Sequence, residues 1–358
     1  MIDFLIIGGG IAGVSAAARL ATLGSVTVLE QEDALAYHAS GRSAAVYEDN
    51  YGAPAVVALN RASREGLEAA DGGVLTPRGF LMLGNADNSA RFDVDKAVMD
   101  QTEISVSEAL TLCPVIDTST VTRAAYHNTA KDIDTDRLVQ HFVRLARSAG
   151  AQFKTRSAVS QITRTAKGWD VQAGQAVFQA RQIVNAAGAW ADQIAQMAGI
   201  SPLGLTPYRR SMARIPAPAG YDVSDWPMIF GPGETWYAKP DAGALIVSPA
   251  DETSVAPHDA YADELTLAEG LDRYGQHVTA PITRLLASWA GLRTFAPDRN
   301  LVIGPSHEDG DFLWCAGQGG YGIQTSFGAS QLLSDLVSGA KSSLDASTIT
   351  DTQAIRFS

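Results

Sequence analysis

Three glycines near the N-terminus and a glutamate further along have the types and spacing needed to bind a dinucleotide. Gly8, Gly10 and Gly13 occupy the three glycine positions of a G-x-G-x-x-G motif. The first glycine allows a tight turn, the second lets a pyrophosphate approach the backbone, and the third lets helix and strand pack closely. Glu30 can accept hydrogen bonds from ribose hydroxyls and repels a 2′-phosphate. The motif predicts a dinucleotide that lacks a 2′-phosphate.

Apolar runs on both sides of the glycines predict the βαβ unit that such a site requires. We expect Asp3–Ile7 to form a buried strand, Val14–Leu23 a helix and Val26–Leu29 a second buried strand. Because the helix starts at the glycines, its N-terminus offers N–H groups and a partial positive charge to phosphates. The motif alone does not separate FAD from NAD. The predicted cofactor-binding residues of this unit are Gly8, Gly10, Ile11, Ala12, Gly13, Glu30 and Gln31.

The loop after the second strand is the first of three segments that bear on the identity of the dinucleotide. Its small residues, from His38 to Ala45, suit a chain that lies against a cofactor, where Arg42 and Ser43 reach phosphate oxygens. An ordinary surface loop with an exposed arginine fits this composition equally well. The predicted cofactor-binding residues of the loop are Ser40, Arg42, Ser43, Ala44 and Ala45.

A strand that ends in small residues is the second segment. Gln182–Asn185 runs directly into Ala186–Gly188, so almost no side-chain bulk stands at its end. Flavoproteins with two dinucleotide folds place such a strand end beside the cofactor. Ahead of it, Ala158–Thr163 and Trp169–Val171 alternate as antiparallel strands, and Val159 is expected to meet an adenine through its backbone. The predicted cofactor-binding residues here are Val159, Ala187, Gly188 and Trp190.

The third segment is a second strand–glycine–helix arrangement late in the chain. We expect strands at Val302–Gly304 and Phe312–Gly317, after which the glycine-rich run Gln318–Ser326 opens a helix extending to about Val337. Such a helix N-terminus stabilises the negative charge that develops at the pyrimidine end of a flavin on reduction. An NAD enzyme needs no such site, so the three segments together predict FAD. The predicted cofactor-binding residues here are Gly291, Gln318, Gly319, Gly320, Tyr321, Gly322, Ile323 and Gln324.

Composition and charge favour a soluble protein of two domains. A chain of 358 residues is too long for one ordinary core, and 46% hydrophobic with 18% charged residues indicates a globular fold. A formal net charge of -12 repels nucleic acid and anionic lipid, so neither is expected as a partner. The apolar run Phe4–Ala18 lacks a basic start, and Arg19 ends it below membrane-spanning length. We expect no transmembrane segment and a cytoplasmic location.

The cysteines and clustered acids predict neither a disulfide framework nor a metal site. Cys113 and Cys315 are too few for either, and reduced thiols are expected. The alternating acids of Lys131–Asp136 lack the glycine and the distant glutamate of a calcium loop. They are expected to lead into a helix over Arg137–Ala149 and to cap it.

Nine motifs are spread over nearly the whole chain: IIGGGIAG, YHASGRSAAVY, DIDTDRL, VNAAGAWAD, RRS, DWPM, YAKPDAG, WAGLRTFAPD and GQGGYGIQTS. Together they resemble the FAD-dependent D-amino acid oxidase (DAO) superfamily, most of all its bacterial D-amino acid dehydrogenases and, among these, the D-arginine dehydrogenases. The resemblance implies an α/β fold with a discontinuous, Rossmann-like FAD-binding domain of the glutathione-reductase type, a β-sheet-rich substrate domain, and non-covalent FAD.

The resemblance also implies a site for an amino acid. Arg210, Tyr237 and Arg293 fall where similar enzymes hold the substrate carboxylate, and Tyr51 falls where an aromatic residue lines the pocket. A guanidinium offers the planar fork that matches a carboxylate and stays charged at every working pH. Tyr321 falls in the loop where the flavin ring and the substrate amine meet the backbone.

Two positions depart from the resemblance. Phe80 stands where the arginine-oxidising enzymes have an acidic residue, and Val46 stands where they have a histidine near the flavin. Phe80 therefore favours a neutral or apolar substrate side chain, unless Glu48 or Asp49 supplies a charge. No histidine is assigned a role.

The resemblance implies oxidative deamination of a D-amino acid. Hydride passes from Cα to flavin N5, and the resulting imine hydrolyses to a 2-oxo acid, which needs no obligatory protein base. An unidentified electron acceptor other than oxygen is expected. Two alternatives stay open: an amine oxidase for glycine or sarcosine, and a non-catalytic flavoprotein subunit or redox sensor.

The expected domains are interleaved along the chain. The FAD-binding domain comprises residues 1–80, 140–205 and 285–358, and the substrate domain comprises 81–139 and 206–284. In the second insert, Ser211–Ile215, Trp236–Lys239 and Ala244–Val247 alternate as strands of a sheet that covers the flavin.

Overall fold

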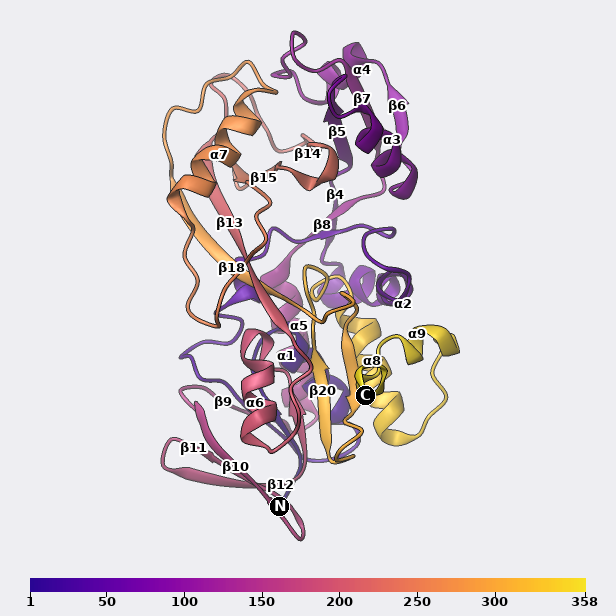
Figure 1. Cartoon of the computed structure of the whole chain (residues 1–358), viewed down its shortest axis with the longest axis vertical. Coiled ribbons are helices and arrows are strands. Elements are labelled where there is room, and N and C mark those ends of the chain that lie inside the picture. The colour runs from indigo at the N-terminus through magenta and orange to yellow at the C-terminus, as the bar shows by residue number, and fades with distance from the viewer.

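The computed structural model describes the whole chain, residues 1–358. One large β-sheet lies in the lower half of Figure 1 and another in the upper half, and β13 (Thr206–Pro216) extends from the lower half into the upper one. A third, small sheet pairs β3 (Val46–Tyr47), β8 (Lys131–Ile133) and β4 (Leu75–Pro77). No helix combines the length and the apolar character that a membrane crossing requires.

The lower sheet has eight strands in the order β10-β11-β12-β1-β2-β9, with β20 on β12 and β19 on β20. Strand β1 is buried on both faces, because Ile6 belongs to one hydrophobic core and its neighbours Leu5 and Ile7 belong to another. Its parallel pairing with β2 and β12 joins the two nucleotide segments of the sequence. The strands are β1 (Ile2–Ile7), β2 (Val26–Leu29), β9 (Gln152–Lys154), β10 (Val159–Thr165), β11 (Gly168–Ala173), β12 (Ala176–Asn185), β19 (Val302–Pro305) and β20 (Phe312–Ala316).

Helices α1 (Ile11–Leu20), α5 (Thr135–Ser148) and α8 (Ser326–Ser338) pack together beside this sheet. Helix α5 buries one apolar stripe, and the carboxylate of Asp134 caps it by accepting a hydrogen bond from the backbone N–H of Arg137 at 3.0 Å. This confirms the predicted capped helix. The remaining helices are α2 (Pro54–Ala69), α3 (Ser89–Val98), α4 (Val106–Leu112), α6 (Ala191–Met197), α7 (Glu264–Gly275) and α9 (Ala346–Thr350).

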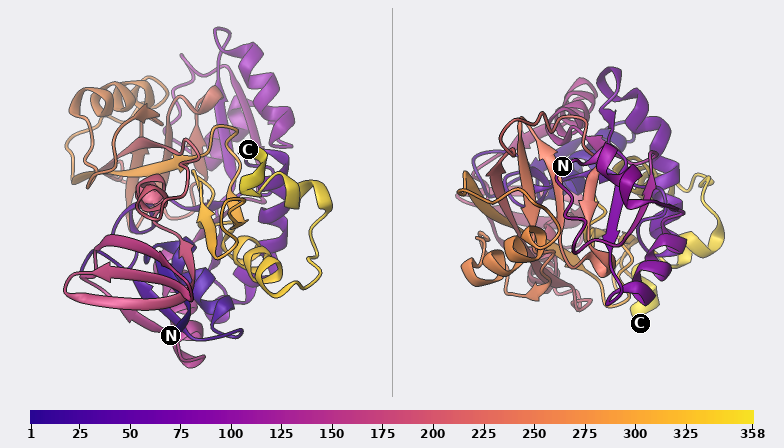
Figure 2. Two further views of the ribbon diagram at one scale, coloured as in Figure 1. Left: turned by 60° about the horizontal axis from the view of Figure 1, so that its bottom comes forward. Right: turned by 90° about the horizontal axis from the view of Figure 1, so that it is seen from above.

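The upper sheet has nine strands in the order β17-β13-β16-β15-β14-β5-β7-β6, with β18 paired to β13. Helix α7 lies outside this sheet, as Figure 1 and both views of Figure 2 show. The strands predicted in the second insert are confirmed as parts of β13, β15 and β16. The further strands are β5 (Phe80–Gly84), β6 (Thr102–Ile104), β7 (Arg123–His127), β14 (Met228–Phe230), β15 (Tyr237–Asp241), β16 (Ala244–Ser248), β17 (Thr253–Ser254) and β18 (Ala287–Phe295).

The predicted division into domains stays a prediction, and β18 and α5 do not fit it. Strand β18 falls in the predicted FAD-binding range 285–358, yet it pairs with β13 from Ala287 to Phe295 and so belongs to the upper sheet. Helix α5 starts at Thr135, inside the predicted substrate range, although its buried face packs on α1. Both differences arise because contacts with partners far away in the sequence decide where a strand pairs and where a helix packs.

Candidate functional site

The turn from β1 into α1 is built by glycines that admit no side chain. Gly8 has a φ of +108°, a conformation that other residues rarely adopt. A Cβ on Gly13 would lie 1.9 Å from the carbonyl oxygen of Gly8, so the helix packs against the strand end only because that Cβ is missing. These are the turn and the close packing predicted for the first and third glycines of the motif.

The N-terminus of α1 is partly capped from other segments. The first turn of a helix leaves N–H groups without acceptors inside the helix. The hydroxyl of Ser40 accepts from the backbone N–H of Ile11 at 2.9 Å, and no acidic side chain stands in the first turn. Glu30 is buried, and its carboxylate accepts hydrogen bonds from the backbone N–H groups of Gly9 at 2.7 Å and Glu32 at 2.9 Å. The remaining N–H groups are available to an anion.

A cavity of about 1020 Å³, the Glu30 cavity, lies at this helix end. Its wall includes the strand end predicted to be free of bulk, with Ala187 and Gly188, and the aromatic pair His38 and Trp190, whose ring centroids are 4.8 Å apart. The predicted cofactor-binding residues that line it are Gly8, Gly10, Glu30, Gln31, Ser40, Arg42, Val159, Ala187, Gly188, Trp190 and Gly291.

The Arg42 side chain does not point its charge at this cavity. Its guanidinium donates to the carbonyl oxygens of Tyr37, Ala260 and Ala290 and forms an ion pair with Asp259 at 2.6 Å. Arg42 therefore ties the cofactor loop to the segment around Asp259. The predicted contact between its guanidinium and phosphate oxygens has no support in the structure, because its donors are directed at protein acceptors.

A second cavity, of about 770 Å³, continues from the first. This Gln318 cavity shares Gly10, Ser40 and Gly291 with the Glu30 cavity, so the two form one continuous space. The loop before α8 forms one of its walls, as the glycine-rich run predicted. The predicted residues that line it are Gly10, Ile11, Ala12, Ser40, Arg42, Ser43, Gly188, Arg210, Gly291, Arg293, Gln318, Gly319, Gly320, Gly322 and Ile323.

A third cavity, of about 690 Å³, adjoins the second where Arg210 and Arg293 line both. In this Phe80 cavity the lower and upper halves of the molecule contribute to one site. Gly13 and Tyr321 are the predicted site residues that line none of the three cavities. The predicted residues that line the Phe80 cavity are Ser43, Ala44, Ala45, Tyr51, Phe80, Arg210, Tyr237, Arg293, Gly320, Ile323 and Gln324.

Arg210, on β13, is a buried cation with free donors. It is 2% exposed, and its Nη2 donates to Glu252 at 3.2 Å, whereas its Nε and Nη1 have no hydrogen-bond partner. Glu252 is shared, because it also pairs with Arg299 at 2.8 Å. Buried donors without a partner are costly, which makes this guanidinium a strong site for an anion.

Arg293, on β18, lies at the same end of the Phe80 cavity. A Cβ on Gly320 would come within 3.0 Å of its Nη1, so the glycine loop packs directly against the guanidinium. Burial opposes the positive charge, but Tyr51, Tyr237 and Glu234 nearby raise the pKa of Arg293 overall, so it stays ionised. Arg210 and Arg293 therefore bring two positive charges to one cavity.

The tyrosines around these arginines differ in their surroundings. Tyr237 is buried, and its hydroxyl donates a hydrogen bond to the Met212 sulfur at 3.5 Å. Burial raises the pKa of the Tyr51 hydroxyl, so it stays protonated. The Tyr321 ring packs against Tyr51 with centroids 5.2 Å apart, which makes it a support for Tyr51.

The chain matches the family described as FAD dependent oxidoreductase (DAO) over residues 3–336. The chain belongs to this FAD-dependent oxidoreductase family. The predicted superfamily, α/β fold class and FAD cofactor are thereby confirmed. The preference for D-amino acids stays a prediction.

Relatives of this family member include the mitochondrial dimethylglycine dehydrogenase of Homo sapiens, which is 26% identical over 372 residues, covering 94% of this chain and 42% of that protein. The chain thus spans less than half the length of this relative. The solved structures that share its fold include an L-proline dehydrogenase and a glycine oxidase. The L-proline dehydrogenase from P. horikoshii has a TM-score of 0.84 at 22% identity over 99% of this chain and 97% of its own. The glycine oxidase from Geobacillus kaustophilus has a TM-score of 0.82 at 22% identity over 97% of both chains.

The cavities of this protein fit FAD. The Glu30 and Gln318 cavities form one channel that begins at an acid for ribose hydroxyls, passes a helix N-terminus suited to phosphates, and ends at the glycine loop. Thr294 lines this channel, and Gln324 lines the adjoining Phe80 cavity. The buried Oγ1 of Thr294 and Nε2 of Gln324 have no hydrogen-bond partner in the protein. Buried polar groups are normally paired, so these two atoms are suited to the polar edge of a flavin. The sulfur atoms of Cys113 and Cys315 line none of the three cavities.

Sequence reasoning missed one feature of the Phe80 cavity. Glu48 is 3% exposed and lines the cavity, and its Oε2 lies 3.3 Å from Nε2 of His127. His127 reaches this position because β7 pairs with β5 in a register that sets it opposite Phe80. From the sequence, Glu48 was only one of two alternative sources of a negative charge near the substrate side chain, and no role was predicted for His127. Only the strand register, which no local motif encodes, brings them together.

Proposed function

We propose that this protein is a D-amino acid dehydrogenase that oxidises the Cα–H bond beside the amine. The observation that carries the proposal is the pair Arg210 and Arg293, which line both the Gln318 cavity and the Phe80 cavity. Two guanidinium groups at this junction suit a substrate that carries a carboxylate next to its reacting carbon.

The residues around the junction would orient that substrate. Arg210 donates through Nε and Nη1, Arg293 presents a second charge, and the Tyr237 hydroxyl adds a hydrogen bond to the carboxylate. Bound FAD supplies the two-electron acceptor for a hydride. Fixing the carboxylate fixes which face of Cα meets the Gln318 cavity, and this is how the arginines would set the stereochemistry. The buried apolar wall excludes water from the reacting carbon.

Preference for the D-enantiomer and for an acceptor other than oxygen is proposed on the likeness of the motifs to bacterial D-amino acid dehydrogenases. A second candidate is oxidation of glycine or an N-methylated glycine. The likeness to dimethylglycine dehydrogenase and to a glycine oxidase favours it. Both substrate classes carry the carboxylate for which Arg210 and Arg293 are suited.

The test is anaerobic mixing of the FAD-loaded protein with D-amino acids, their L-enantiomers, glycine, sarcosine and dimethylglycine, followed by the visible flavin absorbance. Loss of that absorbance with D-amino acids supports the proposal. Loss only with glycine or its N-methyl derivatives supports the second candidate, and loss only with L-amino acids contradicts the proposed enantiomer. No loss with any of them would favour a non-catalytic flavoprotein.

A further inference from the structure

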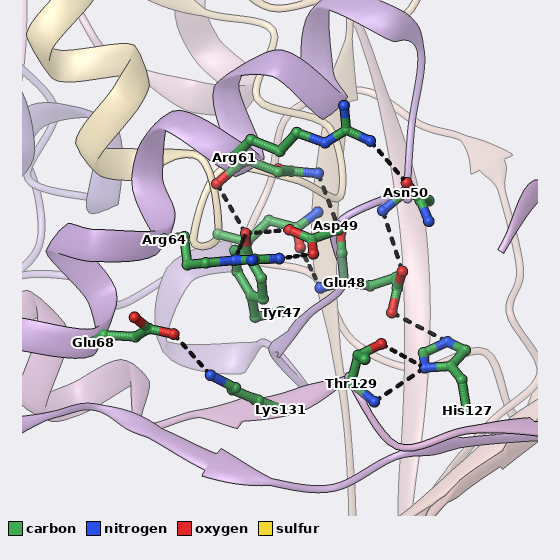
Figure 3. A network of polar contacts seen from close by, with 12 residues as sticks. Tyr47, Glu48, Asp49, Asn50, Arg61, Arg64, Glu68, His127, Thr129 and Lys131 are labelled. Carbon is green, nitrogen blue, oxygen red and sulfur yellow. Dashed lines mark hydrogen bonds and ion pairs between the residues drawn. The ribbon is translucent and has the colours of Figure 1, made fainter. Parts of the chain in front are cut away.

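Glu48 is a buried carboxylate with a free oxygen. Its Oε1 accepts from the backbone N–H of Asn50 at 3.1 Å, and its own backbone N–H donates to Oε1 of Gln324 at 3.0 Å. Its Oε2 has no hydrogen-bond partner, although it lies 3.3 Å from Nε2 of His127. Figure 3 shows Glu48 and His127 facing each other beside the ion pairs of the neighbouring segment. An unpaired buried carboxylate oxygen on a cavity wall calls for a ligand.

His127 does not balance the charge of Glu48. Nδ1 of His127 accepts from the backbone N–H of Thr129 at 3.3 Å, so the neutral ring carries its proton on Nε2. That nitrogen lies 3.3 Å from Oε2 of Glu48, but the contact lacks hydrogen-bond geometry and leaves the oxygen without a partner. Burial lowers the pKa of His127, which favours this neutral form at physiological pH. Arg64, the nearest cation on α2, pairs with Asp49 instead. The protein therefore supplies Glu48 with no dedicated counter-ion.

Glu48 also lies away from the arginines. Glu48 contacts His127 on β7, whereas Arg210 and Arg293 stand on the paired strands β13 and β18. Strands β5, β14, β15 and β16 lie between β7 and β13. The wall between the ends is apolar: Val46, Phe80, Met99, Met228 and Phe230. The cavity thus has Arg210, Arg293 and one carboxylate, that of Glu234, at one end, an apolar wall, and the Glu48 carboxylate beyond it. This is the polarity expected for an α-amino acid with a long aliphatic side chain that ends in a cation.

We propose that Glu48 selects substrates whose side chain ends in a cationic amine, with Glu48 pairing with that distal group and the apolar wall enclosing its methylene stem. This rests on the proposed function, which places the substrate carboxylate at Arg210 and Arg293. Phe80 then contacts the stem and does not exclude the charge, which revises the neutral or apolar preference expected from Phe80 alone. Burial raises the pKa of Glu48 to about 7, so in the absence of a cation it is often protonated. Besides Arg64, Asp100 and Asp49, the titratable groups near it are His127, Tyr47 and Tyr51.

The experiment compares two substrates that differ only at the distal group. D-lysine and D-2-aminoheptanoate have side chains of equal length, with an ammonium in one and a methyl in the other. The FAD-loaded wild type, Glu48→Gln and Glu234→Gln are each mixed anaerobically with both, and kcat/KM for flavin reduction is measured. Glu234 lines the same cavity at the arginine end, so Glu234→Gln is a matched control for the loss of one carboxylate.

In the wild type, kcat/KM for D-lysine is expected to exceed kcat/KM for D-2-aminoheptanoate by at least 10-fold. In Glu48→Gln the ratio of the two kcat/KM values falls by about 100-fold, because an ammonium then faces a buried amide. Glu234→Gln changes both values together and keeps the ratio. Equal use of the two substrates by the wild type, or a ratio that Glu48→Gln leaves unchanged, would overturn the proposal.

A binding measurement separates this proposal from the proposed function. 6-Aminohexanoate carries the carboxylate and the distal ammonium but has no α-amine to oxidise, and heptanoate carries a methyl in place of the ammonium. Their dissociation constants are measured from the shift of the flavin absorbance. Tighter binding of 6-aminohexanoate to the wild type, lost in Glu48→Gln, supports the role of Glu48 even if no amino acid reduces the flavin. Equal binding contradicts it.

Discussion

The nucleotide end and the Phe80 cavity differ in how the chain builds them. At the nucleotide end, Gly8, Gly13 and Glu30 stand within a single βαβ unit, and each has a role fixed by local geometry. The Phe80 cavity combines Glu48, Arg210 and other residues from segments far apart, held by two sheets. The first region has the features of a site for the cofactor common to the family, and the second is where we propose that one substrate is distinguished from another. Local motifs therefore predict the chemistry better than they predict the specificity.

The largest expected effect is at the arginine end of the Phe80 cavity. Arg293→Met removes one of the two guanidinium groups and should lower kcat/KM for flavin reduction by about 1000-fold, because the substrate carboxylate loses a charged partner. Arg164→Met is the control, since Arg164 pairs with Asp309 and Asp311 and none of the three lines a cavity. An equal loss in both variants would mean that the effect comes from the fold and not from the site.

The next effect tests the nucleotide end. Gly13→Ala places a Cβ 1.9 Å from the Gly8 carbonyl oxygen, so strand and helix must separate. We expect a loss of unfolding free energy of about 3 kcal/mol and a lower flavin content in the purified protein. Gly275→Ala is the matched control, because a Cβ there meets nothing within 4 Å. Full retention of FAD and stability in Gly13→Ala would contradict the close packing at this turn.

A smaller effect concerns the pH dependence of stability. The pKa of Glu48 is raised by burial from an ordinary 4.5 to about 7. Between these values the folded state holds the proton and the unfolded state does not, so stability falls as the pH rises from about 4.5 to 7, by up to roughly 3 kcal/mol. Glu48→Gln removes this loss.

Denaturant unfolding at pH 5 and pH 8 measures the effect. Relative to the wild type, the free energy of unfolding of Glu48→Gln should rise by about 1–3 kcal/mol between pH 5 and pH 8. Glu65→Gln, at an exposed position on α2, should show no such gain. A parallel pH dependence in the wild type and in Glu48→Gln would show that Glu48 is ionised throughout.

The smallest effect is expected for the link between the cofactor loop and the upper half. Asp259→Asn breaks the ion pair with Arg42. The side chain of Asp259 is 58% exposed. Solvent screens such a pair, so the loss of unfolding free energy should stay below about 1 kcal/mol and become smaller in high salt. Thermal unfolding at low and high salt checks this. A larger, salt-independent loss would mean that the guanidinium of Arg42 depends on Asp259 to hold the loop.

The sequence predicted the elements whose patterns are local. The turn at Gly8, the small strand end at Gly188 and the glycine loop before α8 all lie where the motifs placed them. The side chain of Arg42 and the pair of Glu48 and His127 were not predicted. Their partners are set by the pairing of β13 with β18 and of β5 with β7, and the register of distant strands is not written in any short stretch of residues.

The central claim is that Arg210 and Arg293 hold the carboxylate of an amine that reduces FAD. The most direct measurement is anaerobic flavin reduction by D-lysine, L-lysine and 1,5-diaminopentane, which is lysine without its carboxylate. The account predicts rapid loss of the visible flavin absorbance with D-lysine alone. Equal reduction by 1,5-diaminopentane would contradict it, because the two arginines would then have no part in positioning the substrate.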